Sequence, residues 1–476
     1  MARKKQKEQP LIEGVEITGV AAEGKAVARI DDFVVFIPFG APGDVADVRI
    51  VKKKHSYGEG RIERMVAPST THRTEPVCEH FGTCGGCKWQ HLPYAYQLEC
   101  KRQQVVDALD RIGHVKHPEV LPIIGADPIY EYRNKLEFTF SNRKWLTFEQ
   151  LAQATADTPR NGAGFHIPGS FDKVLDINAC HLMEPFNNRL RLFIKDYAER
   201  NGLTFSDPRT HEGLLRTMMV RTASTGEKMA LIVFGEDDRE AIASVMAAVE
   251  KEFPEITSLI YTVNTKLNDS FADLPMTTWS GAPFITEAMG ELRFRVGPKS
   301  FYQTNSRQAQ RLYETAREFA ALTGNEVVYD LYTGTGTIAC FVAGKARRVV
   351  GIEYVPEAIA DAKVNAEVNG LADKTAFFAG DMKDVLNAEF IAREGRPDVV
   401  IVDPPRAGMH TDVVDTLLKA SPERIVYVSC NPATQARDLA LLTAEDTPYS
   451  VTAVQPVDMF PHTAHVENVV LIEKTR

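Results

Sequence analysis

Short runs of apolar and polar residues, separated by Gly or Pro, fill the first 67 positions of the chain. The strand-like runs are VEITGV, KAVARI, FVVFIPF, DVADVRIV and GEGRIERMV. Each run has the length and the β-branched content of a strand. Five short strands predict a small barrel of the OB type, an architecture that often binds nucleic acids. We place this first domain at residues 1–67, followed by a linker at 68–72.

The middle of the chain, residues 73–300, mixes two kinds of pattern. Strand-like runs (LEFTF, TMMVR, MALIVF, SLIYTV) stand beside amphipathic helical stretches such as residues 237–252. This mixture predicts a central α+β domain. A polar insert at 150–163 interrupts the pattern and is expected to form a loop.

Strands alternate regularly with helical stretches in the last part of the chain, which we assign to a third domain at residues 301–476. The segment NEVVYDLYTGTGTI indicates a strand, a glycine turn and the start of a helix. Further strands are predicted in RRVVGIEYV, TAFFAGD, PDVVIVDPPR and RIVYVSCNP, and the last two runs, YSVTAVQPVDMF and HVENVVLIEKTR, suit an antiparallel hairpin. The alternation predicts an α/β fold with a doubly wound, mostly parallel, Rossmann-like sheet.

Composition and charge qualify this picture. No apolar run approaches the roughly 18 residues that span a bilayer, and the basic start, MARKKQKEQP, is not followed by an apolar signal core. We therefore expect a cytoplasmic protein without a membrane partner. The net charge of −9 argues against a nucleic-acid partner, but residues 49–64 contain six Lys or Arg against two acids. Either this stretch, with Lys52, Lys53 and Lys54, contacts RNA, or it is a solvated loop.

Four acidic residues follow predicted parallel strands, where open α/β sheets bind ligands. Carboxylates there suit ribose hydroxyls and a sulfonium cation, but they suit pyrophosphate poorly. The glycine turn alone would also fit a dinucleotide, and each acid alone could simply cap the next helix. The four acids are Asp330, Glu353, Asp381 and Asp403.

The seven cysteines divide into three groups, and cytosolic thiols are expected to stay reduced. Cys430 ends a predicted strand on the ligand side of the sheet, where a partly exposed thiol can act as a nucleophile, although a buried packing role is the alternative. Cys340 and Cys100 are expected to be structural. The remaining four cysteines include a C-x5-C-x2-C cluster, and they suit either zinc or a [4Fe–4S] cluster. They are Cys78, Cys84, Cys87 and, as the best fourth candidate, Cys180.

Several motifs resemble the RNA 5-methyluridine methyltransferases. They are DLYTGTGTI, GIE, DPPR-x-G at 403–408, VSCNP, PHTAHVEN and FYQTN at 301–305. The N-terminal barrel looks like a TRAM domain, and the cysteine cluster also matches the family, in which it implies [4Fe–4S]. The resemblance implies S-adenosylmethionine as cofactor, bound by Gln303, Tyr332, Glu353 and Asp403, with Asp381 and Thr337 as weaker candidates.

The chemistry of uracil explains why such an enzyme needs a thiol and a base. Carbon 5 is a poor nucleophile until a thiolate adds to carbon 6, and the C5 proton must later be removed. The resemblance assigns these roles to Cys430 and Glu467, while His462 or His465 is an alternative base. The target base must leave its stack, so a flipped or single-stranded uridine is implied. Arg406 could contact phosphate or the base, or form a capping salt bridge.

The sequence indicates the RNA substrate less directly than it indicates the reaction. A TRAM-like barrel with a cysteine cluster resembles the enzymes that act on 23S ribosomal RNA more than those that act on transfer RNA, and a tRNA uridine is the alternative. A methyltransferase acting on amines is another alternative, but Arg406 stands where its motif has an aromatic residue. A non-catalytic RNA-binding iron–sulfur scaffold is the third. No oligomeric state is predicted.

Overall fold

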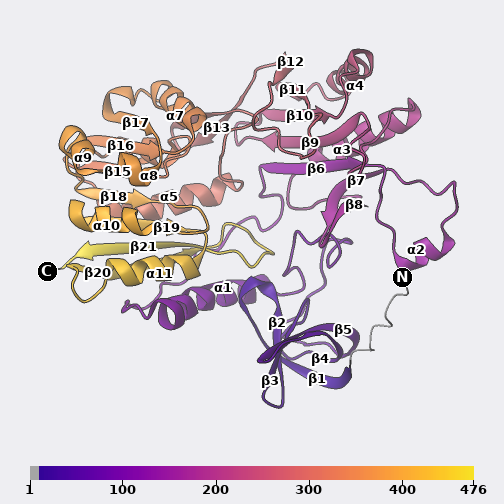
Figure 1. The fold of residues 1–476 in the computed structure, drawn as a ribbon, viewed down its shortest axis with the longest axis horizontal. Helices are drawn as coiled ribbons and strands as arrows, with labels where there is room; N and C mark the ends of the chain where they lie inside the picture. The colour runs from indigo at the N-terminus through magenta and orange to yellow at the C-terminus, as the bar shows by residue number, and fades with distance from the viewer. Residues whose placement is uncertain (1–9, 476) are drawn as a thin grey trace.

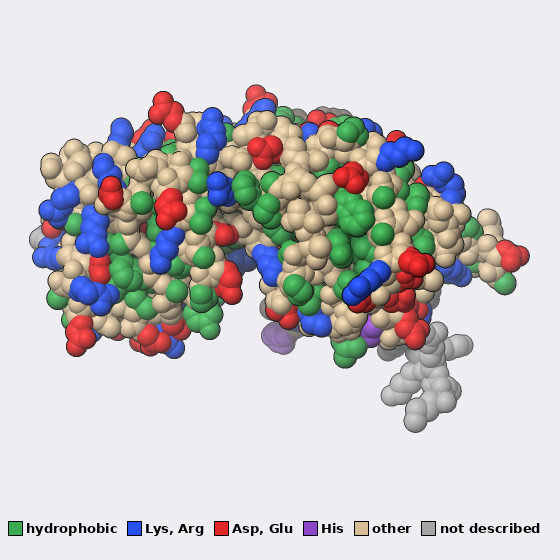
Figure 2. Space-filling model, turned by 90° about the horizontal axis from the view of Figure 1, so that it is seen from above, with side chains coloured by type: hydrophobic (Ala, Val, Ile, Leu, Met, Phe, Trp, Pro, Cys, Tyr) green, Lys and Arg blue, Asp and Glu red, His purple; other side chains and the backbone are tan. Residues whose placement is uncertain are grey.

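The computed structural model describes residues 10–475 in three parts, with a C-terminal sheet on the left of Figure 1, a second sheet at the upper right and a barrel below. The N-terminal stretch MARKKQKEQP lies outside these residues except for Pro10. Within the described chain, no helix combines the length and apolar character that crossing a membrane requires. Figure 2 shows Lys and Arg side chains interspersed with Asp and Glu over the upper face.

The barrel consists of five strands in the closed order β1-β2-β3-β5-β4, as the sequence predicts. Alternate residues such as Val35 and Ile37 are fully buried inside it, because successive side chains of a strand point to opposite faces. Gly60 lies so close to the core that a Cβ atom would stand 2.5 Å from Val48. The strands are β1 (Leu11–Val20), β2 (Ala26–Ile30), β3 (Phe33–Ile37), β4 (Val45–Lys53) and β5 (Tyr57–Ala67).

The central sheet has seven strands in the order β12-β11-β10-β9-β6-β7-β8. The polar insert expected as a loop at 150–163 begins inside a short helix, α2 (Phe148–Gln153), which Thr147 and Gln150 start with a capping box, and it ends in the first residues of β7. The strands are β6 (Lys135–Ser141), β7 (Gly162–Ile167), β8 (Ser170–Asp176), β9 (Leu215–Thr222), β10 (Lys228–Phe234), β11 (Ser258–Val263) and β12 (Thr277–Gly281), and the other helices are α3 (Phe186–Arg200) and α4 (Arg239–Glu252).

The C-terminal sheet has the order β17-β16-β15-β18-β19-β21-β20. Its first five strands are parallel, while β21 runs antiparallel to β19 and to β20, so the predicted doubly wound sheet and final hairpin are confirmed. The strands are β15 (Val327–Leu331), β16 (Arg348–Glu353), β17 (Thr375–Ala379), β18 (Val399–Val402), β19 (Arg424–Ser429), β20 (Tyr449–Val457) and β21 (Glu467–Lys474).

Helices cover both faces of this sheet and form two separate cores. One core includes α5 (Ser306–Ala320), α6 (Thr337–Ala343) and α7 (Pro356–Val368), and a two-stranded unit of β13 (Ile285–Met289) and β14 (Leu292–Val296) packs beside it. The other core includes α8 (Met382–Val385), α9 (Ala388–Glu394), α10 (Thr411–Ala420) and α11 (Pro432–Leu442). Short 3-10 helices lie at η1 (Ala22–Gly24) and η3 (Ala372–Lys374).

Helix α1 (Tyr94–Ala108) and its π-helical extension η2 (Leu109–Gly113) precede the central sheet in the chain, yet they pack on the C-terminal one. Val105 and Leu109 join the core that contains α11. Gly113 lies so close to α11 that a Cβ atom would stand 2.6 Å from the Ala436 carbonyl oxygen. In Figure 1, α1 therefore runs between α11 and the barrel.

The loop between β20 and β21, residues 458–466, is where the parts of the molecule meet, and we call it the junction loop. Its first residue, Asp458, forms a fully buried ion pair with Lys101 of α1 at 2.5 Å. Tyr132 donates a hydrogen bond to the Pro461 carbonyl at 3.1 Å, and the backbone N–H groups of Lys88 and Trp89 donate to the His462 carbonyl. The Trp89 indole donates in turn to Gly24 of the barrel at 3.1 Å.

Candidate active site

The predicted cofactor residues gather at the carboxyl edge of the C-terminal sheet. The strand order reverses between β15 and β18, two neighbouring parallel strands, so this edge contains the topological switch point at which open α/β sheets bind ligands. Asp403 directly follows β18, and Glu353 ends β16. The turn after β15 carries Tyr332 and the glycines.

This turn has a backbone shape suited to a close ligand. Tyr332 (φ 65°) and Gly336 (φ 75°) both lie in the left-handed region, which glycine adopts without steric cost. A Cβ atom on Gly336 would stand 2.9 Å from Ala362, so helix α6 approaches α7 closely. Glu353 accepts hydrogen bonds from the Gly334 and Val355 N–H groups at 3.1 and 3.0 Å. The glutamate thereby fixes the turn and stays at the ligand edge.

The other predicted cofactor residues differ in their surroundings. Asp381 caps α8 through the Lys383 N–H at 3.3 Å and pairs with the Lys383 ammonium at 3.6 Å, which is the helix-capping arrangement named as the alternative. The Gln303 carbonyl accepts from Asn134 at 2.9 Å. Thr337, buried at the start of α6, has its hydroxyl 3.3 Å from that of Thr335.

Asp330 is a buried acid that the sequence places among the four strand-end acids, but that the family resemblance did not assign to the cofactor site. It accepts a hydrogen bond from the Thr333 hydroxyl, while its second oxygen has no partner in the described chain. Burial raises the pKa of Asp330 to about 7. The strand-end position was the only signal in the sequence, and it did not distinguish Asp330 from a helix-capping residue.

Sheet register brings Cys430 and Glu467 to the same place. Strands β19 and β21 pair antiparallel with Ser429 opposite Asn468. The next residues along the two strands are Cys430 and Glu467, which are therefore neighbours at the end of the ladder. Glu467 is 4% exposed, whereas Cys430 is half-buried.

Burial and neighbouring acids control the charges of this pair. Burial, followed by the negative charges of Glu467 and Asp403, raises the pKa of the Cys430 thiol to about 11. Burial, followed by the charge of Asp403, raises the pKa of Glu467 to about 8. Arg406 opposes both shifts, and burial raises the pKa of Asp403 to about 7. At neutral pH, thiol and glutamate are therefore mostly protonated and uncharged.

A cleft of about 1100 Å³ opens beside Cys430. Its walls come from the loop after β1, from α1 with η2, and from the loops that hold Arg406 and His465. The Arg406 guanidinium lies 3.5 Å from the His465 ring and forms no ion pair with the described residues, so the salt bridge named as its alternative is not observed. Arg406 remains available to a ligand in the cleft.

The two histidines of the junction loop have different surroundings. His462 is buried, its ring stacks on Tyr130 with centroids 4.3 Å apart, and burial lowers its pKa to about 4. Its Nδ1 lies 3.2 Å from the Gln97 amide, on the side of α1. His465 is exposed beside Arg406.

The four predicted cluster cysteines line one cavity of about 590 Å³, together with Arg133 and three histidines. All four thiols are half-buried and free, and burial raises their pKa values, to about 12 for Cys87 and about 11 for Cys180. Within residues 10–475, however, no three His, Cys, Asp or Glu side chains are arranged to hold a metal ion. Cys340 is buried in α6 as expected, and Cys100 lines the cleft beside Cys430.

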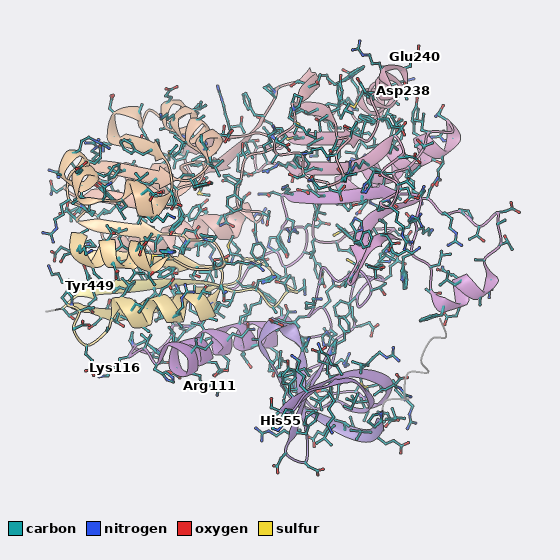
Figure 3. The ribbon with its side chains drawn as sticks, in the orientation of Figure 1. His55, Arg111, Lys116, Asp238, Glu240 and Tyr449 are labelled. Atoms are coloured by element: carbon teal, nitrogen blue, oxygen red, sulfur yellow. The ribbon has the colours of Figure 1, made fainter. Side chains whose placement is uncertain are left out.

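The basic stretch lies on the barrel. Lys53 and Lys54 stand over the rings of Phe33 and Tyr57 at 5.2 and 5.0 Å, and Lys52 is 3.8 Å from Glu59. The three side chains are exposed. In Figure 3, His55, which follows them, lies beside the barrel on the side that faces α1 and Arg111.

Two parts of the chain match known protein families, and the whole chain is similar to known RNA methyltransferases. Residues 286–475 match the family described as tRNA (Uracil-5-)-methyltransferase, and residues 12–62 match the TRAM domain. A Porphyromonas gingivalis protein, named "Uncharacterized RNA methyltransferase", is 58% identical and covers 96% of this chain and 99% of the relative. A Bacteroides thetaiotaomicron protein of the same name is 56% identical, covering 95% of this chain and 100% of the relative.

A solved structure extends the likeness to the whole architecture. The Pyrococcus abyssi tRNA (uracil-54, C5)-methyltransferase in complex with S-adenosyl-L-homocysteine has a TM-score of 0.74 and 27% identity, covering 97% of this chain and 100% of that one. Fold and comparisons together define an S-adenosylmethionine-dependent RNA methyltransferase. The chain belongs to the RNA uracil-5-methyltransferase family.

The electrostatics predict how Cys430 reacts with an alkylating agent. Because thiolate is the reactive form, labelling by iodoacetamide should be slow at pH 7 and should rise about tenfold per pH unit up to pH 10. Glu467→Gln should speed labelling at pH 9, because it removes a negative charge that raises the pKa of the thiol. Mass spectrometry of the tryptic peptide 425–437 measures the rate, with buried Cys340 as the internal control. A rate already maximal at pH 7 would contradict the raised pKa.

Proposed function

We propose that this enzyme methylates carbon 5 of a uridine in 23S ribosomal RNA through a covalent bond between Cys430 and carbon 6. The observation that carries the proposal is the pairing of a half-buried thiol with a buried carboxyl group at the end of the β19–β21 ladder. The adjoining cleft gives an RNA base a route to the sulfur. A flipped or single-stranded uridine fits this arrangement.

The proposed reaction conserves atoms and electrons in three steps. The Cys430 thiolate adds to C6, and the electrons of the C5–C6 double bond move into the C4 carbonyl to form an enolate. Carbon 5 would then take the methyl group of bound S-adenosylmethionine as the sulfonium S–CH3 bond breaks, with its electron pair kept by the sulfur of the S-adenosylhomocysteine that leaves. Ionised Glu467 removes the C5 proton, the C5–C6 double bond reforms, and the thiolate leaves.

The raised pKa of Glu467 suits the last step. A carboxyl group with a pKa of about 8 is a stronger base than an ordinary glutamate, and it is still partly ionised near neutral pH. Arg406 stabilises the ionised forms of both Cys430 and Glu467. We assign Arg406 a second role in contacting the RNA at the mouth of the cleft.

The cofactor assignment rests on the carboxyl edge of the sheet. We propose that Glu353 binds the ribose hydroxyls, and that the other cofactor-binding residues are Gln303, Tyr332 and Asp403, with Thr337 as a weaker candidate. Asp381 contributes less, because it is engaged with α8 and Lys383. Asp403 also raises the pKa values of Cys430 and Glu467, so its charge acts on the proposed reacting pair as well as on the cofactor site.

Two RNAs are candidate substrates, 23S ribosomal RNA and transfer RNA. The combination of a TRAM barrel with the cysteine cluster supports 23S ribosomal RNA. The likeness to the Pyrococcus abyssi tRNA enzyme supports a tRNA uridine, because that likeness spans 100% of the archaeal chain. Architecture alone is therefore compatible with both RNAs, and we propose 23S ribosomal RNA on the basis of the cysteine cluster.

Trapping the covalent intermediate tests the mechanism and the substrate together. Glu467→Gln should still permit attack and methyl transfer but should block proton removal, leaving methylated RNA bonded to the protein. The expected result is a denaturation-resistant protein–RNA band with 23S ribosomal RNA and S-adenosylmethionine. RNA containing 5-fluorouracil should trap the wild-type enzyme in the same way, because fluorine cannot leave as a proton does.

Controls separate the possible failures. Cys430→Ala should give neither adduct nor product. Product formation from normal RNA without any adduct on fluorinated RNA would overturn the covalent mechanism. Adducts with fluorinated tRNA and none with 23S ribosomal RNA would overturn only the substrate.

For the four cysteines around one cavity, we propose a [4Fe–4S] cluster bound by Cys78, Cys84, Cys87 and Cys180. A single zinc ion requires four ligands that converge to about 2.3 Å from one point, an arrangement absent from residues 10–475. A cubane of four irons and four sulfides is larger, and it suits thiols spread around a cavity of about 590 Å³. Methyl transfer needs no redox step, so the proposed role is structural.

Metal analysis tests the cluster. Anaerobically purified protein should be brown and contain about four irons per chain. Cys180→Ser should lose the cluster, whereas Cys340→Ser should retain it because Cys340 is buried in α6, away from the cavity. Stoichiometric zinc without iron would refute the proposal, and an intact cluster in Cys180→Ser would refute the fourth ligand.

The exposed lysines of the barrel are the proposed RNA contacts. Replacing Lys52, Lys53 and Lys54 with alanine should weaken RNA binding and reduce its salt dependence by about 0.7–0.9 per lost contact, because fewer counterions are released. Cofactor affinity should stay unchanged. A matched variant that neutralises exposed Lys345, Lys363 and Lys419 controls for net charge. Equal RNA affinity in both variants would favour the solvated loop.

A further inference from the structure

The Glu467 carboxyl group has no hydrogen bond of its own among residues 10–475. The packing around this buried side chain and the backbone on either side of it therefore determine its place. Glu467 itself pairs with Val457 of β20, and the residues after it are held by β19 and β20. The residues before it belong to the junction loop, so contacts that fix this loop also fix the carboxyl group.

His462 is the strained point of the junction loop. Its φ of 65° is unusual for a residue other than glycine and persists only where the surroundings impose it. Both of its backbone groups are bound from outside the loop. The N–H donates to the Gln97 side chain at 2.8 Å, and the carbonyl accepts from the N–H groups of Lys88 and Trp89 at 2.8 and 3.0 Å.

Gln97 of α1 forms hydrogen bonds both to His462 and to the segment after the cysteines that contacts His462. Its side-chain amide donates to the carbonyls of Trp89 and Leu92 at 3.0 and 2.9 Å and lies 3.2 Å from His462 Nδ1, while its oxygen accepts from the His462 N–H. The side chain is fully buried. Because a buried amide left without partners destabilises the fold, this set of bonds holds one arrangement of the loop.

The bonds to His462 also connect the loop to the cysteine segment. Lys88 and Trp89 directly follow Cys87, the last cysteine of the C-x5-C-x2-C cluster. The Tyr130 ring stacks on the His462 ring, with the two ring centroids 4.3 Å apart. The segment that carries the cysteines thus reaches the residue that lies five positions before Glu467.

We propose that Gln97 is a positioning residue for Glu467, holding His462 and the loop before the base so that the cysteine segment and α1 control the rate of C5-proton removal. This inference rests on the covalent mechanism proposed above. The steps before proton removal depend on Cys430 and the cofactor edge, which lie on other strands. Gln97 should therefore matter for release of the product much more than for attack or methyl transfer.

The test compares Gln97→Met with Asn187→Leu, a variant of another fully buried side-chain amide that binds carbonyls within the central domain. Gln97→Met should transfer the methyl group in a single turnover but release product about tenfold more slowly, since small misplacement of a catalytic group is costly. Methylated protein–RNA adduct should therefore accumulate during turnover. Asn187→Leu should accumulate none, and both variants should bind S-adenosylmethionine as the wild type does.

A second variant covers the case in which Gln97→Met does not fold. Tyr130→Leu removes the stacking partner of His462 from a half-buried position and should show the same slowed release. Fluorinated RNA should trap all folded variants equally, because that adduct does not require Glu467. Trapping without accumulation of methylated adduct in the Gln97 and Tyr130 variants would overturn the positioning role. Absence of trapping in the wild type would instead overturn the covalent mechanism.

Discussion

The fully buried ion pair between Lys101 and Asp458 determines how the parts of this molecule fit together. The two residues lie 357 positions apart in sequence and 2.5 Å apart in space. Tyr94 and the Phe460 N–H donate further hydrogen bonds to the same carboxylate. Removing one partner of such a pair leaves an uncompensated buried charge, which costs about 3–5 kcal/mol. The pair therefore holds α1 against the end of β20 and sets where the junction loop begins.

Burial of Cys430 and Glu467, the proposed reacting groups, has a chemical consequence. The thiol has a pKa of about 11 and the carboxyl group beside it a pKa of about 8, so both are mostly uncharged at neutral pH. This protonation avoids two adjacent negative charges in a poorly solvated place. Arg406 is the nearby cation that opposes both shifts. The same burial that suppresses the thiolate at rest makes Glu467 a strong base once it is ionised.

Local patterns in the sequence predicted local structure well. The five barrel strands, the parallel sheet and the final hairpin follow from alternation and glycine turns, whereas Cys430 and Glu467 were paired by the resemblance of their motifs to the RNA 5-methyluridine methyltransferases. The packing of α1 was not predictable, because its buried face carries the polar residues Gln97 and Lys101. Gln97 contacts His462 and Lys101 contacts Asp458, and each of these two partners lies more than 350 residues away. Asp381 and Asp330 look alike as strand-end acids, and only the structure distinguishes a helix cap from a buried carboxyl group.

The central claim is that this enzyme replaces the C5 proton of uridine by a methyl group, and that Glu467 is the base that removes the proton. RNA labelled with tritium at C5 of uracil tests it directly. The wild-type enzyme should release tritium to water one for one with methyl groups transferred, and Glu467→Gln should transfer methyl groups while retaining the tritium. Methyl transfer by the wild type with tritium retained, or release by Glu467→Gln at the wild-type rate, would contradict the account.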